Sequence, residues 1–208
     1  MAWQSVSGAT TAWAESAANP EVTSAHAVRD GERRVPAAMD DSLLCLVEIP
    51  KGSRNKYEWD PKLRAIKLDR FLFSSVVYPT DYGFIPETFA EDGDPLDAMV
   101  LVSEPTFPGC VIPVKPIALF RMRDDKGQDD KVVCVPVDDP NWNNHEKLED
   151  IAQPLRDEIS HFFSIYKTPE GKVVKVDGWY PREAALEVIE QARTRWSAEM
   201  PEDTPSRP

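Results

Sequence analysis

The sequence predicts an α+β fold: a small closed, OB-like β-barrel with helices packed on its outside, mainly near the C-terminus. Three observations support this prediction. The middle of the chain consists of short Val-, Ile- and Leu-rich segments of partly alternating polarity, as half-buried strands require. Prolines and glycines separate these segments. Segments with helical spacing follow only afterwards, and strands first with helices last is typical of α+β proteins.

Five segments are predicted as strands, and a sixth is expected where the apolar run AMVLV (98–102) follows an acidic stretch. The five are LLCLVEI (43–49), LRAIKLDR (63–70), GCVIPVKPIALFRM (109–122), KVVCVPV (131–137) and KVVKVDGW (172–179). Prolines and glycines are densest around 79–95 and 104–116, so we expect long functional loops there.

Two helices are predicted in the C-terminal third. In the first, Pro154 suits a first-turn position, and the apolar face is Leu155, Ile159, Phe162, Phe163 and Tyr166. The second begins at Pro181, with Ala185, Ile189, Ala192 and Trp196 on one face. The faces that end in Phe162 and Trp196 suit either the core or an interface between subunits.

The chain of 208 residues is long enough for one domain, which we place at residues 41–200. Residues 1–40 are rich in Ala, Ser and Thr without periodicity and are predicted to be a disordered extension; residues 201–208 are predicted to be a flexible tail. The chain has no apolar run of about 18 residues and no secretory signal. Its three cysteines form no C-x-x-C pair and are expected to be buried, reduced thiols. We therefore expect a cytoplasmic protein.

The formal net charge of −12 argues against nucleic-acid and membrane partners, which attract positively charged proteins. The charge is concentrated in two places. Residues 81–104 contain seven acidic residues and no Lys or Arg, and DDKGQDDK (124–131) contains four aspartates. Both segments call for an explanation.

The first acidic segment predicts a cation site. Asp92, Asp94 and Asp97 surround Gly93 and Pro95, which disfavour a helix. Two carboxylates 4 Å apart repel each other by about 4 kcal/mol at an effective dielectric constant of 20, so their convergence calls for a cation. A solvated acidic turn is the alternative. The second segment, with Asp124, Asp125, Asp129 and Asp130 around another turn, favours the cation site if both loops meet at the barrel rim.

The ligand types indicate which metal would bind. The acidic segments offer only oxygen, and His26, His145 and His161 lie elsewhere, so Mg²⁺, Mn²⁺ or Ca²⁺ fits better than zinc or copper. An EF-hand does not fit, because Asp97 and Ser103 stand where its glycine and glutamate would be. Several carboxylates with water resemble a phosphoryl-transfer site more than a calcium cage.

Residues that suit phosphate binding alternate with the acidic ones. They are Lys56, Arg70, Tyr78, Tyr82, Lys131, Tyr166 and Lys167. Each alone is more readily explained as a solvated surface charge or a core tyrosine; together they alternate with the acids, as a metal–phosphate cluster requires. The chain has no P-loop, G-x-G-x-x-G, H-E-x-x-H or G-x-S-x-G motif, which disfavours a nucleotide-binding kinase or a serine hydrolase.

Five motifs resemble those of the family I soluble inorganic pyrophosphatases, in family order, and the short bacterial type is the most similar. They are EIPKGSRNKYE (48–58), YPTDYGFIPET (78–88), EDGDPLDAMVL (91–101), DDKGQDDK (124–131) and HFFSIYK (161–167). The resemblance spans about residues 44–195. The chain departs from the family in having one fewer residue between Pro50 and Lys56 than some relatives, and Gln128 where an acid often stands.

The resemblance implies a hydrolase that converts pyrophosphate into two orthophosphates by direct attack of a metal-activated water. It implies three to four Mg²⁺ per site, with Mn²⁺ as a substitute, and a homo-oligomer, a hexamer by analogy. It also implies roles for individual residues. The implied metal ligands are Asp92, Asp97, Asp124, Asp129 and Glu48; the proton acceptor is Asp94; the phosphate ligands are Lys56, Arg70, Tyr82, Lys131, Tyr166 and Lys167; and Glu58, Tyr78 and Asp125 support them.

Two other functions fit a small barrel of this kind. An oligonucleotide-binding barrel needs a basic groove with exposed aromatic residues, which the net charge disfavours. A catalytically inactive cation-binding or interaction protein on the same barrel would be expected to have lost Lys56, Arg70 or Asp94, and the chain has all three.

Overall fold

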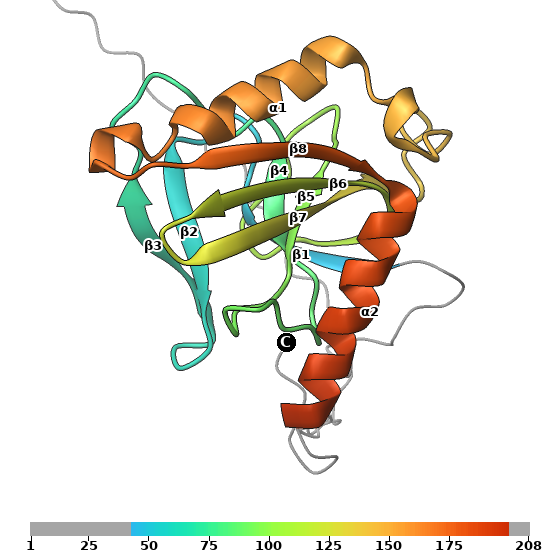
Figure 1. The fold of residues 1–208 in the computed structure, drawn as a ribbon, viewed down its shortest axis with the longest axis horizontal. Coiled ribbons are helices and arrows are strands. Elements are labelled where there is room, and N and C mark those ends of the chain that lie inside the picture. Colours follow the sequence, from blue (N-terminus) through green and yellow to red (C-terminus); the bar gives the residue numbers. More distant parts are fainter. Residues whose placement is uncertain (1–42, 200–208) are drawn as a thin grey trace, which may run out of the picture. The chain divides into compact units, whose positions relative to one another are not determined.

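The computed structural model of the chain describes residues 43–199. The predicted extension 1–40 and tail 201–208 lie outside these residues. The strands are β1 (Leu43–Ile49), β2 (Asn55–Asp60), β3 (Ala65–Phe71), β4 (Asp81–Phe84), β5 (Asp97–Val100), β6 (Val111–Asp124), β7 (Gly127–Pro136) and β8 (Lys175–Pro181). The helices are α1 (Gln153–Ile165) and α2 (Arg182–Glu199), with one-turn 3₁₀ helices η1 (Leu148–Asp150) and η2 (Thr168–Glu170) (Figure 1).

Five strands close into a ring, which confirms the predicted barrel. The sheet order is β1-β4-β5-β7-β6-β8, and β1 also pairs with β6, so β8 is the one strand of this sheet outside the ring. All ring pairs are antiparallel except β5–β7. At the β1–β4 contact only glycine fits, because a Cβ on Gly83 would lie 1.9 Å from the Leu46 carbonyl oxygen.

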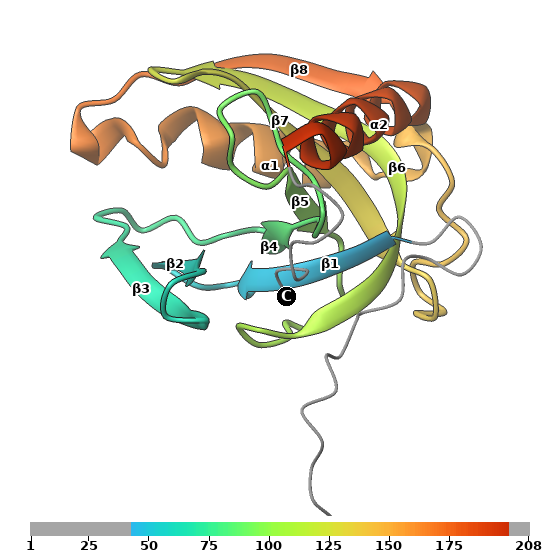
Figure 2. The ribbon, with the colours of Figure 1, turned by 90° about the horizontal axis from the view of Figure 1, so that it is seen from below.

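The hairpin of β2 and β3 is a separate two-stranded sheet. Figure 2 shows it beside the end of β1, away from the ring formed by the other strands. We call this hairpin the β2–β3 ribbon. It is therefore held against the barrel by contacts other than a continuous strand ladder.

Both helices pack on the barrel through the faces that the sequence predicts. α1 has proline in its first turn and buries Ile159, Phe162 and Phe163. α2 buries Ala185, Val188, Ile189 and Ala192. Phe162 is buried in the monomer core, and Trp196 is half buried and packs on Phe89.

Several predicted boundaries are corrected. The proline-rich segment 79–95, where a long loop is expected, contains β4, because backbone pairing with β1 and β5 outweighs the local loop composition. β6 begins at Val111, close to the start of the strand predicted at 109–122. Pro181 ends β8, pairing with Ala118, so α2 begins one residue later. β2 is not predicted at all: its six residues are polar or aromatic and only half buried.

The seven acidic residues between Asp81 and Glu104 do not form one group, as the charge count alone implies. The Asp81 side chain is fully buried and accepts hydrogen bonds from Lys51 N–H (2.8 Å) and from the Thr106 N–H (3.1 Å) and hydroxyl (2.6 Å). It joins two loops and is not part of a cation site. Four of the seven acids line the pocket described below: Glu87, Asp92, Asp94 and Asp97.

The structure also bears on the predicted absence of membrane spans and on the three cysteines. Within residues 43–199, no helix is long and apolar enough to cross a membrane. All three cysteines are free; Cys45 and Cys134 are buried as predicted, whereas Cys110 is only half buried. Burial raises the pKa of the Cys45 and Cys134 thiols, which keeps them protonated.

Candidate active site

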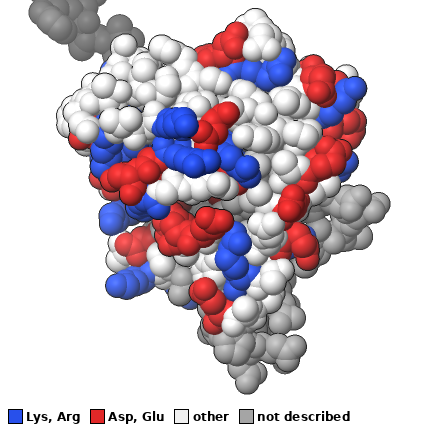
Figure 3. Space-filling model, in the orientation of Figure 1, with Lys and Arg blue, Asp and Glu red and all other residues white. Residues whose placement is uncertain are grey.

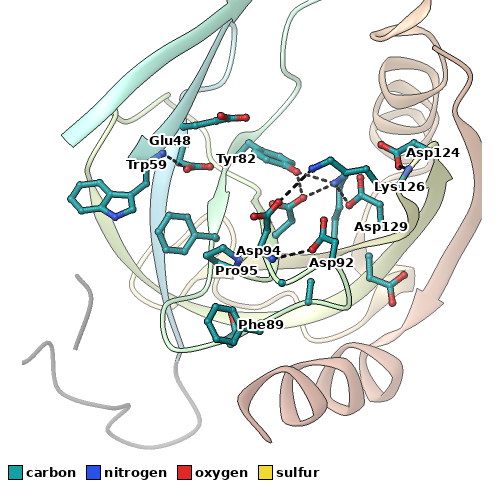
Figure 4. Close-up of a pocket in the computed structure, with 18 of the residues that line it drawn as sticks. Glu48, Trp59, Tyr82, Phe89, Asp92, Asp94, Pro95, Asp124, Lys126 and Asp129 are labelled. Carbon is teal, nitrogen blue, oxygen red and sulfur yellow. Dashed lines mark hydrogen bonds and ion pairs between the residues drawn. The ribbon is translucent and has the colours of Figure 1, made fainter. Parts of the chain in front are cut away.

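A pocket of about 480 Å³ opens between the β2–β3 ribbon, the barrel and the end of α1. Its walls come from β1 to β5, from the β6–β7 hairpin and from the segment after α1. In Figure 4, Glu48 and Trp59 lie on one side of the pocket, and Asp92, Asp124 and Asp129 lie on the other, with Tyr82 between them. The two acidic segments of the sequence therefore meet, as predicted.

The loop between β4 and β5 carries Asp92 and Asp94. Gly93 has a positive φ of 83°, which favours glycine, and the Asp94 N–H donates to the Asp92 carboxylate at 3.1 Å. The buried Thr88 hydroxyl accepts from Leu96 N–H at 3.0 Å and donates to the Ile85 carbonyl at 2.5 Å. These bonds hold the base of the loop while its acidic tip faces the pocket.

Helix α2 holds the same loop from the outside. Phe89 N–H donates to the Ala192 carbonyl at 3.0 Å, and Arg195 Nε donates to the Phe89 carbonyl at 2.9 Å. The Phe89 ring packs on Trp196 with centroids 4.8 Å apart. The C-terminal half of α2 thus fixes the position of a loop that the sequence places about a hundred residues earlier.

A buried lysine lies at the centre of the site. Lys131 Nζ donates to Asp97 Oδ2 at 2.8 Å, to Asp129 Oδ1 at 2.6 Å and to the Tyr82 hydroxyl at 2.9 Å. The Tyr82 hydroxyl in turn donates to Asp97. Burial opposes the charge on Lys131, but the two carboxylates outweigh it and raise the pKa of the ammonium. Burial, only partly offset by Lys131, raises the pKa of Asp129.

The β6–β7 hairpin contributes a second carboxylate–lysine pair. Lys167 Nζ donates to Asp124 Oδ2 at 2.5 Å, and Lys126 N–H donates to Asp124 Oδ1 at 2.8 Å. These bonds outweigh burial and lower the pKa of Asp124. On the hairpin tip, Lys126 Nζ lies 3.6 Å from Asp94 Oδ2; both side chains are exposed, and Asp94 raises the pKa of Lys126.

The β2–β3 ribbon brings two further cations. Lys56 pairs with Glu58 on the same strand and lies 3.5 Å from Asp69 Oδ2 on β3. Arg70 donates from Nη1 to Asp69 Oδ2 and from Nε to Glu170 Oε1, both at 2.7 Å. Burial opposes the charge on Arg70, and the two carboxylates raise its pKa.

Tyr78, Tyr82 and Tyr166 belong to an aromatic layer beneath the charged groups. Phe162 packs against Tyr78 and Tyr166 with centroids 4.8 and 5.3 Å apart, and Phe163 packs against Tyr82 at 6.1 Å. Burial raises the pKa of all three phenols, so they remain protonated donors.

Glu48 lies on β1 and accepts from Trp59 N–H at 2.6 Å, which joins β1 to the ribbon. Burial raises the pKa of Glu48 to about 8, and Asp97 contributes. Nearby, the Trp59 indole N–H is buried without a hydrogen-bond partner.

Of the fifteen residues singled out from the sequence, fourteen line this one pocket. The exception, Asp125, faces the outside, 3.7 Å from Lys172 Nζ. Sequence reasoning missed Lys126 and Lys172, which line the pocket, and Glu170, which binds Arg70. The proximity of Lys172 and Glu170 to Lys167 was the one available signal.

The donor set fits hard divalent cations. Most of its polar side chains are carboxylates, hydroxyls and ammonium or guanidinium groups, and neither His145 nor His161 lines the pocket. Within residues 43–199, no three carboxylate, imidazole or thiol groups are already arranged as a cage. Instead, Lys131 supplies positive charge between Asp97 and Asp129, which indicates that this pair needs a cation. The residues of the pocket therefore fit a hard divalent cation such as Mg²⁺.

The face of the molecule shown in Figure 3 carries acidic and basic side chains interspersed around the β6–β7 hairpin. No continuous basic stripe runs across this face, as the groove of a nucleic-acid-binding barrel would require.

Comparison with known proteins agrees with this geometry. A family model described as inorganic pyrophosphatase matches residues 45–197. The inorganic pyrophosphatase of Methanosarcina acetivorans is 59% identical over 151 residues, which cover 73% of this chain and 90% of that protein. That of Streptomyces coelicolor is 50% identical over 151 residues, covering 72% and 93%.

Solved structures show the same fold. The inorganic pyrophosphatase of Thermus thermophilus superposes with a TM-score of 0.74 at 45% identity, covering 78% of this chain and 95% of that one. The Helicobacter pylori enzyme gives a TM-score of 0.76 at 36% identity, covering 78% and 98%. The similarity thus extends to archaeal as well as bacterial proteins.

Proposed function

Because the chain belongs to the inorganic pyrophosphatase family and is an inorganic diphosphatase, we propose that the acidic pocket is where it hydrolyses pyrophosphate, with Mg²⁺ as cofactor. The observation that carries this proposal is the convergence of carboxylates from β1, the β4–β5 loop, β5 and the β6–β7 hairpin on one pocket that also presents Lys56, Arg70 and Lys167. Mn²⁺ is the expected substitute.

Five carboxylates would hold the metal ions: Asp92, Asp97, Asp124, Asp129 and Glu48. When bound, Mg²⁺ supplies positive charge for the phosphate oxygens and lowers the pKa of the water that attacks phosphorus. Lys131 Nζ donates to Asp97 at 2.8 Å and to Asp129 at 2.6 Å, and these bonds hold the two carboxylates close together. The Tyr82 hydroxyl donates to Asp97 and fixes its orientation. These contacts preorganise the carboxylates that would otherwise repel one another.

The cations of the pocket bind the substrate's phosphate groups. Pyrophosphate carries several negative charges and would be repelled by the carboxylates alone. Lys56 and Arg70 line the pocket from the ribbon, and Lys167 lines it from just after α1, so the substrate is held from two sides. The buried phenols of Tyr82 and Tyr166 stay protonated and can donate hydrogen bonds to phosphate oxygens.

Asp94 is the proposed proton acceptor. Its carboxylate is exposed at the tip of the β4–β5 loop, and Lys126 Nζ lies 3.6 Å from its Oδ2. Water attacks phosphorus directly, Asp94 takes the proton, and orthophosphate leaves toward the cations of the ribbon. The proposed mechanism is direct attack by water and forms no covalent enzyme intermediate; among residues 43–199, no Ser or Cys lines the pocket.

Substitution of Asp97 tests the site. Asp97→Ala should remove nearly all Mg²⁺-dependent phosphate release from pyrophosphate while the protein stays folded by circular dichroism. The matched control is Glu104→Gln, an exposed acid of the same segment outside the pocket, which should keep wild-type turnover. Near-wild-type turnover of Asp97→Ala would refute the assignment.

Substitution of Asp94 tests the proton acceptor. Asp94→Asn should retain Mg²⁺ binding, measured by calorimetry, and should lower kcat at neutral pH by about 10²- to 10⁴-fold, as the loss of general-base catalysis predicts. If the pH–rate profile of this variant matched the wild type, another group would be the base.

We also propose a homo-oligomer, with a hexamer as the family leads us to expect, and a cytoplasmic location. Large apolar side chains such as Phe73 and Phe107 are exposed on the monomer, which supports an interface. The free thiols support a reducing compartment. Sedimentation equilibrium of the purified chain tests the first proposal, and cell fractionation tests the second.

A further inference from the structure

The β2–β3 ribbon carries Lys56 and Arg70 but does not hydrogen-bond to the strands of the barrel ring as part of their sheet. A ribbon of this kind moves more easily than a strand within a sheet, and two-stranded hairpins are marginally stable alone. Precise presentation of Arg70 therefore depends on contacts made outside the ladder.

One such contact joins the far end of the ribbon to the segment after α1. Arg70 Nε donates to Glu170 Oε1 at 2.7 Å, across a sequence separation of 100 residues. Figures 1 and 2 agree that the end of β3 and the segment after α1 lie side by side. The pair is about one-quarter exposed, so solvent screens it only in part.

The local structure fixes Glu170 firmly. It ends the 3₁₀ turn η2, which begins directly after Lys167, and its N–H donates to the Lys167 carbonyl at 3.0 Å. Gly171 follows with a positive φ of 71° and closes the turn through its N–H on the Thr168 carbonyl. Glu170 thus sits on the same short turn as the phosphate ligand Lys167.

The bonds of Arg70 determine which part of its guanidinium is available. Of its five N–H groups, Nε–H binds Glu170 and one Nη1–H binds Asp69. The three remaining N–H groups, one on Nη1 and two on Nη2, are left for phosphate oxygens. A guanidinium held at two edges by carboxylates offers these donors in a single orientation.

We propose that Glu170 is a positioning residue, which orients Arg70 and holds the β2–β3 ribbon against the segment that bears Lys167, so that both cations meet the same substrate. Glu170 itself does not line the pocket or touch the reacting atoms. This inference rests on the proposed function for its effect on turnover, but its structural part does not.

The test compares Glu170→Gln and Glu170→Ala with Glu146→Gln. Glu146 pairs with Lys115 away from the pocket, so it is a matched carboxylate-to-amide control. Misplacement of Arg70 should lower kcat/KM for pyrophosphate roughly 10- to 100-fold in both Glu170 variants, with a raised KM. Glu146→Gln should match the wild type.

A double-substitution cycle separates positioning from a general loss of structure. Lysine has no planar fork to be oriented, so in an Arg70→Lys background the added Glu170→Gln change should cost less than about threefold. An equal loss in both backgrounds would show that Glu170 acts independently of Arg70 and would overturn the proposal.

Hydrogen–deuterium exchange provides a readout without catalysis. Amides of β3 should exchange faster in Glu170→Ala than in the wild type, whereas the same amides should be unchanged in Glu146→Gln. Unchanged β3 exchange would contradict the proposal even if activity fell. If the wild type failed to hydrolyse pyrophosphate, the proposed function would fail, but the exchange experiment would still decide the role of Glu170.

Discussion

Replacement of Lys131 by methionine should destabilise the metal-free protein strongly. Lys131 is 1% exposed and contacts Asp97 and Asp129 at 2.8 and 2.6 Å. At an effective dielectric constant of about 20, a charge pair about 2.7 Å apart attracts by about 6 kcal/mol. Desolvation of the ammonium opposes these attractions. Removing one partner of a buried ion pair typically costs about 3–5 kcal/mol, because the charge left behind is uncompensated.

The loss of stability in Lys131→Met should become smaller as the pH falls. Burial already raises the pKa of Asp129 above its usual value, and Lys131 opposes that rise. Without the lysine the pKa rises further, so the folded protein binds a proton that the unfolded chain has released. Stability of the variant should therefore increase as the pH falls, and the loss should be smaller at pH 5 than at pH 7.5.

The assay is urea denaturation in EDTA, with Lys115→Met as the control. Lys115 pairs with an exposed carboxylate and should cost about 0–1 kcal/mol. Added Mg²⁺ should narrow the gap between Lys131→Met and the wild type, because a divalent cation replaces charge that the lysine supplied. A loss below about 1 kcal/mol in EDTA, or one that Mg²⁺ and pH leave unchanged, would refute the reasoning.

Three further predictions concern the pocket and its supports. In EDTA the free energy of unfolding of the wild type should fall by up to about 1.4 kcal/mol for each pH unit between pH 5 and 8, because the pKa of Glu48 is raised to about 8 in the folded state. Glu48→Gln should abolish this pH dependence in urea titrations. The same pH dependence in the variant and the wild type would contradict the prediction. Gly83→Ala places a Cβ 1.9 Å from the Leu46 carbonyl and should cost about 3 kcal/mol or prevent folding. Gly52→Ala, with open space but a φ of 85°, should cost only about 1–2 kcal/mol, so equal losses would argue against the close contact. Trp196→Ala should raise the Mg²⁺ concentration for half-maximal activity, because it frees the Phe89 loop, and should cost at least about 0.5–1.5 kcal/mol in thermal unfolding; an unchanged Mg²⁺ requirement would show that α2 does not position the acidic loop.

The strands with apolar faces and β3 of the ribbon were predictable from sequence, whereas β2 and β4 were not. β1 is largely buried and the first part of β6 buries alternate residues, as their apolar and partly alternating sequences indicate. β2 buries none of its residues fully, and β4 lies in a proline-rich segment whose pairing with β1 and β5 is determined by distant residues. Local composition carries no information about such pairing.

The site was predictable where residue types cluster in the chain. The high density of acidic residues in two short segments indicates Asp92, Asp94, Asp97 and Asp129 as site residues. The partners of the site residues cannot be read from the sequence. That Lys131 bridges Asp97 and Asp129, and that Glu170 pairs with Arg70, becomes clear only when the fold shows which segments lie together. Density can also mislead: Asp81 belongs to the same acidic segment, but its buried carboxylate accepts hydrogen bonds from Lys51 and Thr106 and joins their two loops.

The most direct test of the central claim is phosphate release from pyrophosphate by the purified chain, measured with Mg²⁺, with EDTA, and with Mg²⁺ restored after EDTA. If the acidic pocket is the catalytic site, release should require Mg²⁺, disappear in EDTA, return with the metal, and be absent under all three conditions in Asp97→Ala but normal in Glu104→Gln. Release that persists in EDTA, or that survives in Asp97→Ala, would contradict the assignment of catalysis to this pocket.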